Sequence, residues 1–150
     1  MNAARPTLLV VDDDQDNLAR LDATFQASYR VLPVGSGAAA LAVLGAEDID
    51  LLITDQRMPG MAGLELAAQA RKLRPDLPVI LLTAYTDPED LIEAINEGTL
   101  YRYVQKPWDA RDLRATVHHA LEERALRRER DSLQSRMQRR LDALSVLYEV

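Results

Sequence analysis

The chain has 150 residues, 47% of them hydrophobic, and a formal net charge of −6. This length can bury one sizeable core and does not require a second globular domain. The absence of cysteine excludes disulfides and thiolate metal sites, and no segment has the roughly 20 consecutive apolar residues of a membrane span. We therefore expect a soluble, cytoplasmic protein of one domain plus an appendage, without contact to a membrane.

The charge is distributed unevenly along the chain. Residues 1–121 carry a net charge of −7, whereas residues 122–150 carry +1. An acidic domain binds nucleic acid poorly because the phosphate backbone repels it. The seven arginines of the last segment are balanced by six acidic residues, which is typical of a solvated helix with ion pairs. We expect no direct contact with nucleic acid.

Five short apolar runs predict β-strands, and helical patterns lie between them. The runs cover residues 7–12, 29–34, 50–55, 78–84 and 101–106. The runs TLLVV and VILLT are continuously apolar rather than alternating, which is typical of strands in a parallel sheet covered on both faces. The alternation of strand and helix predicts an α/β fold with a five-stranded, doubly wound parallel sheet.

Apolar spacing and capping residues predict the helices in chain order. One face of the first helix is formed by Leu18, Leu21 and Phe25, and one face of the third by Leu64, Ala67, Ala70 and Leu73. The predicted N-cap residues are Ser36 for the second helix, Asp87 for the fourth and Asp109 for the last. Each helix then returns the chain to the start of the next parallel strand.

The composition changes near residue 122, where glycine and proline vanish and charge rises. An apolar stripe recurs there at steps of 7, 4, 4, 3 and 4, formed by Leu126, Leu133, Met137, Leu141, Leu144 and Tyr148. The stripe is too narrow for a globular core, and one helix from Asp109 to the end would measure about 60 Å. We expect a domain over 1–121 and a coiled-coil helix over 122–150 that pairs in parallel with a second copy. The sequence ends within this helix, as in a piece of a longer protein or a stand-alone dimeric regulator.

Polar residues end four of the predicted strands: Asp12, Asp13 and Asp14 the first, Asp55 the third, Thr83 the fourth and Lys106 the fifth. Because parallel strands share their carboxyl edge, we expect these side chains to lie together. Clustered carboxylates repel one another unless a cation neutralises them, and a site of oxygen ligands alone indicates Mg²⁺ or Mn²⁺. Ordinary strand-end polar residues are the alternative, but four such positions at one edge disfavour it.

A carboxylate in this setting can act as a nucleophile toward phosphorus and form an aspartyl phosphate. Asp55 is placed for this role because it stands alone at its strand end. Lys106 can neutralise a phosphoryl oxygen, and Thr83 can donate a hydrogen bond to it.

The motifs VVDDDQ, TDQRMPGMAG, LLTA and VQKPW, in this order and spacing, resemble those of receiver domains of two-component response regulators. The resemblance covers about residues 6–122. It implies a flavodoxin-like fold, a phosphoryl group taken from a sensor histidine kinase or phosphotransfer protein, and a conformational switch that controls an output through the dimeric helix. It implies no enzyme activity beyond autocatalytic transfer to, and hydrolysis from, the chain's own aspartate.

The same resemblance assigns a role to each site residue. Asp55 would accept the phosphoryl group, Lys106 would bind it, and Thr83 and Tyr103 would be the switch residues. The ligands of Mg²⁺ would be Asp12, Asp13, Asp55 and the backbone carbonyl of Arg57. A cis peptide bond before Pro107 would direct Lys106 to the site.

Some residues depart from the family pattern. Asp14 is an extra acid that we expect at the N-terminus of the first helix rather than on the metal. Arg57 and Tyr85 would flank the phosphoryl group and set its lifetime. His118 and His119 follow one another on the last helix, and we expect one to pack and the other to be solvated.

Three other kinds of protein share part of this pattern. A haloacid-dehalogenase-type phosphatase requires Thr or Val where Asp16 stands, and an EF-hand requires glycine where Asn17 stands. A pseudo-receiver, which would act as an interaction module without phosphorylation, typically lacks the Asp, Thr or Lys. All three are present here, so the phospho-accepting receiver is favoured.

Overall fold

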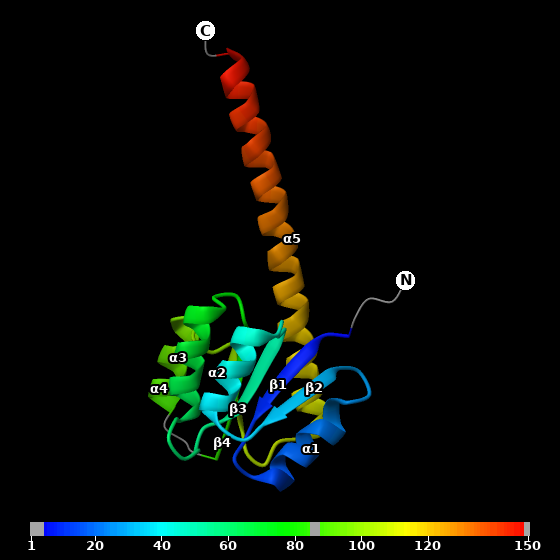
Figure 1. The fold of residues 1–150 in the computed structure, drawn as a ribbon, viewed down its shortest axis with the longest axis vertical. Helices are drawn as coiled ribbons and strands as arrows, with labels where there is room; N and C mark the ends of the chain where they lie inside the picture. The colour runs from blue at the N-terminus through cyan, green and yellow to red at the C-terminus, as the bar shows by residue number, and fades with distance from the viewer. Residues whose placement is uncertain (1–4, 85–87, 149–150) are drawn as a thin grey trace.

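The computed structural model describes residues 5–84 and 88–148 (Figure 1). Strands and helices alternate along these residues, as predicted. Their bounds are β1 Thr7–Val11, α1 Gln15–Phe25, β2 Arg30–Val34, α2 Gly37–Ala46, β3 Leu51–Asp55, α3 Gly63–Leu73, β4 Val79–Thr83, α4 Pro88–Asn96, β5 Arg102–Gln105 and α5 Ala110–Tyr148. The strands pair in parallel in the order β2-β1-β3-β4-β5. The predicted flavodoxin-like fold is confirmed.

Two hydrophobic cores lie on opposite faces of the sheet. Side chains of α2, α3 and α4 form one with alternate residues of the strands, and side chains of α1 and α5 form the other (Figure 1). Every residue of β1, β3 and β4 is buried, whereas the edge strands β2 and β5 are partly exposed. The continuous apolar runs therefore belong to the central strands, as their sequence indicates.

The N-cap residues of three helices are those that the sequence predicts. The Asp14 carboxylate accepts from the backbone N–H of Asp16 at 2.8 Å, and the Ser36 hydroxyl accepts from the N–H of Ala39 at 3.1 Å. Asp109 caps α5 by accepting from the N–H of two residues of its first turn. The predicted cap Asp87 lies outside the described residues, as does Tyr85.

The predicted apolar face of the third helix is wrong in part. Leu64 is only partly buried and Leu73 is 50% exposed, whereas Gly63, Leu66, Ala67 and Ala70 are buried. A step of three residues falls short of a full turn by about 60°, so a strict i, i+3 series moves off the core side of the helix. Steps of three and four together keep one face toward the sheet.

Helix α5 has one part on the domain and one part that projects from it (Figure 1). Leu113, Val117 and Ala120 are buried against the sheet. Farther along, the stripe residues Leu126, Leu133, Met137, Leu141 and Leu144 are between 45% and 66% exposed. No helix in the described part of the chain is long and apolar enough to cross a membrane.

Both adjacent histidines of α5 are exposed, so the expectation that one of them packs is wrong. Residues Leu113, Val117 and Ala120 set the side of the helix that faces the sheet. At about 100° per residue, His118 and His119 both lie on the outer half of the helix.

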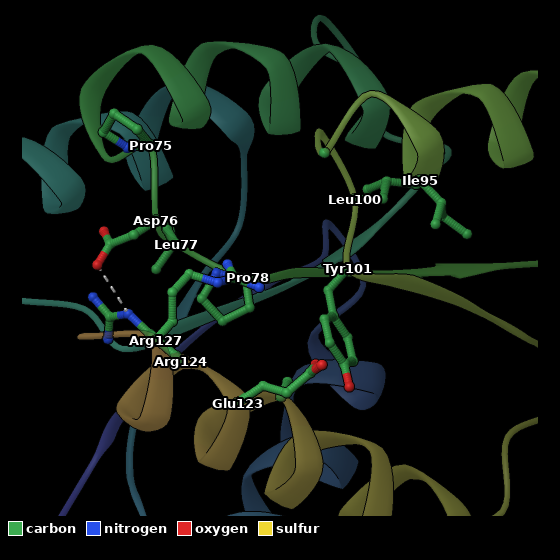
Figure 2. Close-up of a pocket in the computed structure, with 12 residues that line it drawn as sticks. Pro75, Asp76, Leu77, Pro78, Ile95, Leu100, Tyr101, Glu123, Arg124 and Arg127 are labelled. Carbon is green, nitrogen blue, oxygen red and sulfur yellow. Dashed lines mark ion pairs between the residues drawn. The ribbon is translucent and has the colours of Figure 1, made fainter. Parts of the chain in front are cut away.

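An ionic clamp of Arg124, Arg128, Asp50 and Asp76 joins α5 to the domain where the helix leaves it. Arg124 is buried, and its Nη1 donates to the Asp50 carboxylate at 2.9 Å and to the Asp50 carbonyl at 3.1 Å. Asp76 accepts from Arg128 Nε at 2.7 Å and pairs with Arg124 at 3.6 Å. The clamp borders a cavity of about 280 Å³ between α5 and the loops before β4 and β5 (Figure 2).

Candidate functional site

Three aspartates lie together at the carboxyl edge of the sheet, at the ends of β1 and β3. The chain leaves β1 for α1 on one face and leaves the neighbouring β3 for α3 on the other, and ligands of such sheets bind at this point of the carboxyl edge. Carboxylate oxygens of Asp12, Asp13 and Asp55 lie there within 4.8 Å of one another. Asp12 and Asp55 are buried and Asp13 is exposed, so the cluster opens to solvent on one side.

The electrostatics of this cluster leave it with excess negative charge. Burial raises the pKa of the Asp12 carboxyl, and the neighbouring negative charge of Asp55 raises this pKa further. A hydrogen bond from the Asp14 N–H at 2.9 Å opposes the shift. Lys106 Nζ forms an ion pair with Asp55 Oδ1. The single Lys106 ammonium does not neutralise three carboxylates. A divalent cation would offset the remaining negative charge, and carboxylate oxygens are ligands that such a cation prefers.

The remaining predicted residues lie at the same edge or on the adjoining strand. Thr83 is the last residue of β4, beside β3, and is buried. Arg57 lies in the loop two residues after Asp55. Tyr103 is half-buried in β5 and packs against the core formed with α2, α3 and α4. The peptide bond between Lys106 and Pro107 is cis, as expected.

Asp14 is not part of the acidic cluster. Its carboxylate accepts from the backbone N–H groups of Asp16 and Asn17 at the start of α1. The prediction that this extra acid caps the helix is confirmed, and the carboxylate is committed to these two donors.

Residues 8–118 match the sequence profile of the response regulator receiver domain. The chain belongs to this family. The hydrogenase transcriptional regulatory protein HoxA of Cupriavidus necator is 37% identical over 126 residues, which are 84% of this chain and 26% of HoxA. The C4-dicarboxylate transport transcriptional regulatory protein DctD of Rhizobium meliloti is 37% identical over 132 residues, 87% of this chain and 28% of DctD. This receiver therefore spans about a quarter of the length of these relatives.

A solved receiver structure also resembles this chain. The signal receiver domain of an HD-domain-containing protein from Pseudomonas fluorescens Pf-5 has a TM-score of 0.79 and 34% sequence identity, with 87% of this chain and 96% of that chain covered. The likeness extends over nearly the whole of that receiver domain.

The structure adds two residues that position the end of β3 in this receiver. The N–H of Gly63 donates to the Gln56 carbonyl at 3.0 Å, and the Gln56 side-chain oxygen accepts from the N–H of Leu64 at 2.8 Å. A Cβ on Gly63 would lie 2.4 Å from the Asp55 carbonyl oxygen. Sequence reasoning missed both residues. The glycine that closes TDQRMPGMAG was the available signal, because such close backbone contact excludes a side chain.

Proposed function

We propose that this receiver takes a phosphoryl group onto Asp55 from a sensor histidine kinase or phosphotransfer protein in a Mg²⁺-dependent reaction. The observation that carries the proposal is the convergence of Asp12, Asp13 and Asp55, with Lys106 paired to Asp55. The family membership and the transcriptional regulators among its relatives support phosphorylation-based signalling.

The Asp55 carboxylate would attack phosphorus as a nucleophile. An acyl phosphate P–O bond forms while the P–N bond to the donor imidazole breaks, and the imidazole leaves with a proton. The Lys106 ammonium offsets charge on a phosphoryl oxygen, and the Thr83 hydroxyl donates a hydrogen bond to another. Hydrolysis by water would return the carboxylate and release phosphate. Beyond these reactions of its own side chain, the domain would act as a switch.

Magnesium would be held by Asp12, Asp13 and Asp55 together with the backbone carbonyl of Arg57. Burial and the nearby negative charge of Asp55 raise the pKa of Asp12, and a divalent ion bound beside it would favour the charged carboxylate. Bound Mg²⁺ would neutralise negative charge on the phosphoryl oxygens. Mn²⁺ satisfies the same donor set.

Thr83 and Tyr103 would pass the signal to the surface. When the Thr83 hydroxyl turns to a phosphoryl group on Asp55, Tyr103 would move inward toward α4. Tyr103 is half-buried in an edge strand, so it has one side in the core and one side accessible to a partner.

Residues 122–150 would form a parallel homodimeric coiled coil that links two receiver domains, residues 1–121, to an output. The exposure of the apolar stripe supports this proposal, because an unpaired stripe on a projecting helix gains from a second copy. The alternative, a pseudo-receiver that acts without phosphorylation, would not need Asp55, Thr83 and Lys106 together.

The experiment that tests phosphorylation treats the full chain with acetyl phosphate and Mg²⁺ and reads intact mass. We expect one phosphoryl group on the wild type and none on Asp55→Asn, because an amide is a poor nucleophile. Asp16→Asn is the matched control, since this exposed acid lies in the first turn of α1. Equal incorporation in Asp55→Asn would move the site elsewhere, and no incorporation in any variant would favour the pseudo-receiver.

A further inference from the structure

One donor of the ionic clamp is buried without a hydrogen-bond acceptor. The Arg124 side chain is only 9% exposed, and its Nη1 donates to the carboxylate and to the carbonyl of Asp50. Its Nε is the one buried side-chain nitrogen or oxygen in the described part of the chain that has no hydrogen-bond partner. A buried unpaired donor is costly, because folding removes its bonds to water and returns none. The Arg124 Nε–H therefore favours any movement that brings an acceptor to it.

The Asp76 carboxylate lies just beyond the reach of this donor. Its Oδ2 is 3.6 Å from Arg124 Nε, a distance that allows an ion pair but exceeds that of a hydrogen bond (Figure 2). The same Oδ2 accepts from Arg128 Nε at 2.7 Å. Burial raises the pKa of the Asp76 carboxyl, but the hydrogen bond from Arg128 and the charges of Arg124 and Arg128 together lower it. Two arginines thus attract one carboxylate oxygen, and in the structure only Arg128 is bonded to it.

The Asp76 side chain is the part of this contact that can move. Arg124 is held in place by its two bonds to Asp50. The backbone of Asp76 lies in a short loop between Pro75 and Pro78, whose rings restrict it. A movement of Oδ2 by roughly 0.7 Å toward Arg124 Nε would bring the two atoms to hydrogen-bond distance. Rotation of the half-exposed Asp76 side chain can supply this movement without a change in the fold.

We propose that Asp76 alternates between two ion pairs, one with Arg128, as in the structure, and one with Arg124, in which the buried Nε–H gains its acceptor. The pair with Arg128 is weakened by water, because the two side chains are 57% and 39% exposed. The pair with Arg124 removes the cost of an unpaired buried donor. These opposing effects keep the two states close in free energy. The inference goes beyond the proposed function, because it does not require a phosphoryl group on Asp55.

The alternation would decide how firmly the projecting part of α5 is held. Arg128 lies one helical turn beyond Arg124, and its contact with Asp76 ties that turn to the domain. When Asp76 pairs with Arg124, this outer contact is lost, whereas the inner contact of Arg124 with Asp50 remains. The loop that carries Asp76 leads into β4, which ends at Thr83. A displacement of β4 can therefore change the balance between the two pairs.

Nitrogen-15 NMR of the arginine Nε–H groups would test the alternation in the full chain. Arg124→Lys identifies the signal of Arg124 by its loss, because lysine has no Nε–H within the side chain. In Arg128→Met the competing donor is gone, so Asp76 should stay with Arg124. We expect solvent exchange of the Arg124 Nε–H to slow by about tenfold relative to wild type. The double variant Arg128→Met, Asp76→Ala should reverse this slowing.

Arg127→Met is the matched control. Arg127 is a neighbouring exposed arginine that has no hydrogen bond or ion pair with any described residue. Its removal should leave exchange of the Arg124 Nε–H within about twofold of wild type. Amide hydrogen exchange reads the helix itself: Arg128→Met should lower the protection of residues 128–134 by about threefold or more, and Arg127→Met should not.

Each outcome decides a part of the proposal. If the Arg124 Nε–H exchanges equally fast in wild type and in Arg128→Met, Asp76 either bonds both arginines at once or never reaches Arg124, and the alternation is overturned. Slowing that persists in the double variant would identify another acceptor and would overturn it as well. Unchanged protection of residues 128–134 in Arg128→Met would show that the outer contact does not hold the helix.

Discussion

Arg124 and Asp50 join the root of the projecting helix to the start of the strand that carries Asp55. Arg124 Nη1 lies 2.9 Å from the Asp50 carboxylate, and the other oxygen of that carboxylate accepts from the Thr7 N–H at 2.7 Å. One acidic side chain therefore ties α5, β1 and the residue before β3 together.

Replacing Arg124 should destabilise the domain and loosen this junction. Arg124→Met keeps the apolar stem but leaves the Asp50 carboxylate without its cationic partner. Since the Asp50 side chain is 36% exposed, water replaces part of the interaction, and we expect a loss of about 2 kcal/mol. Urea denaturation would measure this loss in the free energy of unfolding. The control Arg127→Met, at an exposed position three residues later, should change stability by under about 0.5 kcal/mol.

Acid should weaken the same clamp through Asp76. Burial alone would raise the pKa of Asp76, but the hydrogen bond from Arg128 and the charges of Arg124 and Arg128 together hold it below its usual range. Because its pKa is lower in the native state, ionised Asp76 stabilises the fold fully above the unfolded-state pKa of about 3.9. This stabilisation is lost as pH falls through the native pKa. Wild type should therefore exceed Asp76→Asn in stability at pH 6, and this difference should shrink as pH falls below the unfolded-state pKa. A difference that stays constant over this fall in pH would show that the charge of Asp76 does not matter.

Gly63→Ala should distort the end of β3. The added Cβ would lie 2.4 Å from the Asp55 carbonyl oxygen and 2.5 Å from a Leu81 methyl group, so backbone and core must both move. We expect a loss of roughly 1–3 kcal/mol and slower phosphorylation by acetyl phosphate. Gly35→Ala is the control, because its Cβ would meet no atom within 4 Å. Wild-type phosphorylation in Gly63→Ala would show that the site tolerates movement of this backbone.

Two features could be predicted from sequence because each follows from the pattern of nearby residues. They are the central strands and the cluster formed by Asp12, Asp13, Asp55 and Lys106. Continuous apolar runs identify strands buried on both faces, and a parallel sheet brings their carboxyl ends to one edge. The Lys106 contact with Asp55 then depends on the strand order, in which β4 alone separates β3 from β5, and on the residue that follows each strand.

Other features depend on contacts between distant segments, which no local pattern encodes. The role of Arg124 in the clamp requires the position of Asp50, 74 residues earlier in the chain. The close approach of Gly63 to Asp55 requires the path of the β3–α3 loop. The face of α3 was misjudged because i, i+3 spacing alone does not fix which side meets the sheet.

The acidic cluster should be a source of instability until a cation binds. Asp12→Asn removes a buried charge whose neighbour is Asp55, so without Mg²⁺ it should raise the melting temperature by a few degrees. Mg²⁺ should stabilise the wild type and have little effect on this variant. Scanning calorimetry with EDTA or with excess Mg²⁺ provides the comparison. If Mg²⁺ stabilises Asp12→Asn as much as wild type, the proposed metal site is wrong.

Thr83→Ala should separate phosphorylation from signalling. The nucleophile Asp55 is intact in this variant, so acetyl phosphate should still modify it. The switch hydroxyl is missing, so the phosphorylation-dependent change in amide exchange over residues 88–106 should be lost. A wild-type exchange response in Thr83→Ala would exclude Thr83 from the relay.

The projecting helix also has a mechanical consequence. From Arg128 to Tyr148 it extends about 30 Å beyond its last clamp residue, at 1.5 Å per residue. A tilt of only about 10° at the clamp would therefore displace the far end sideways by roughly 5 Å. The helix would pivot at the ionic clamp, where Arg124 and Arg128 contact Asp50 and Asp76. Over the roughly 6 Å between Arg124 and Arg128, a movement of about 1 Å can thus become a sideways displacement of about 5 Å at the far end of the helix.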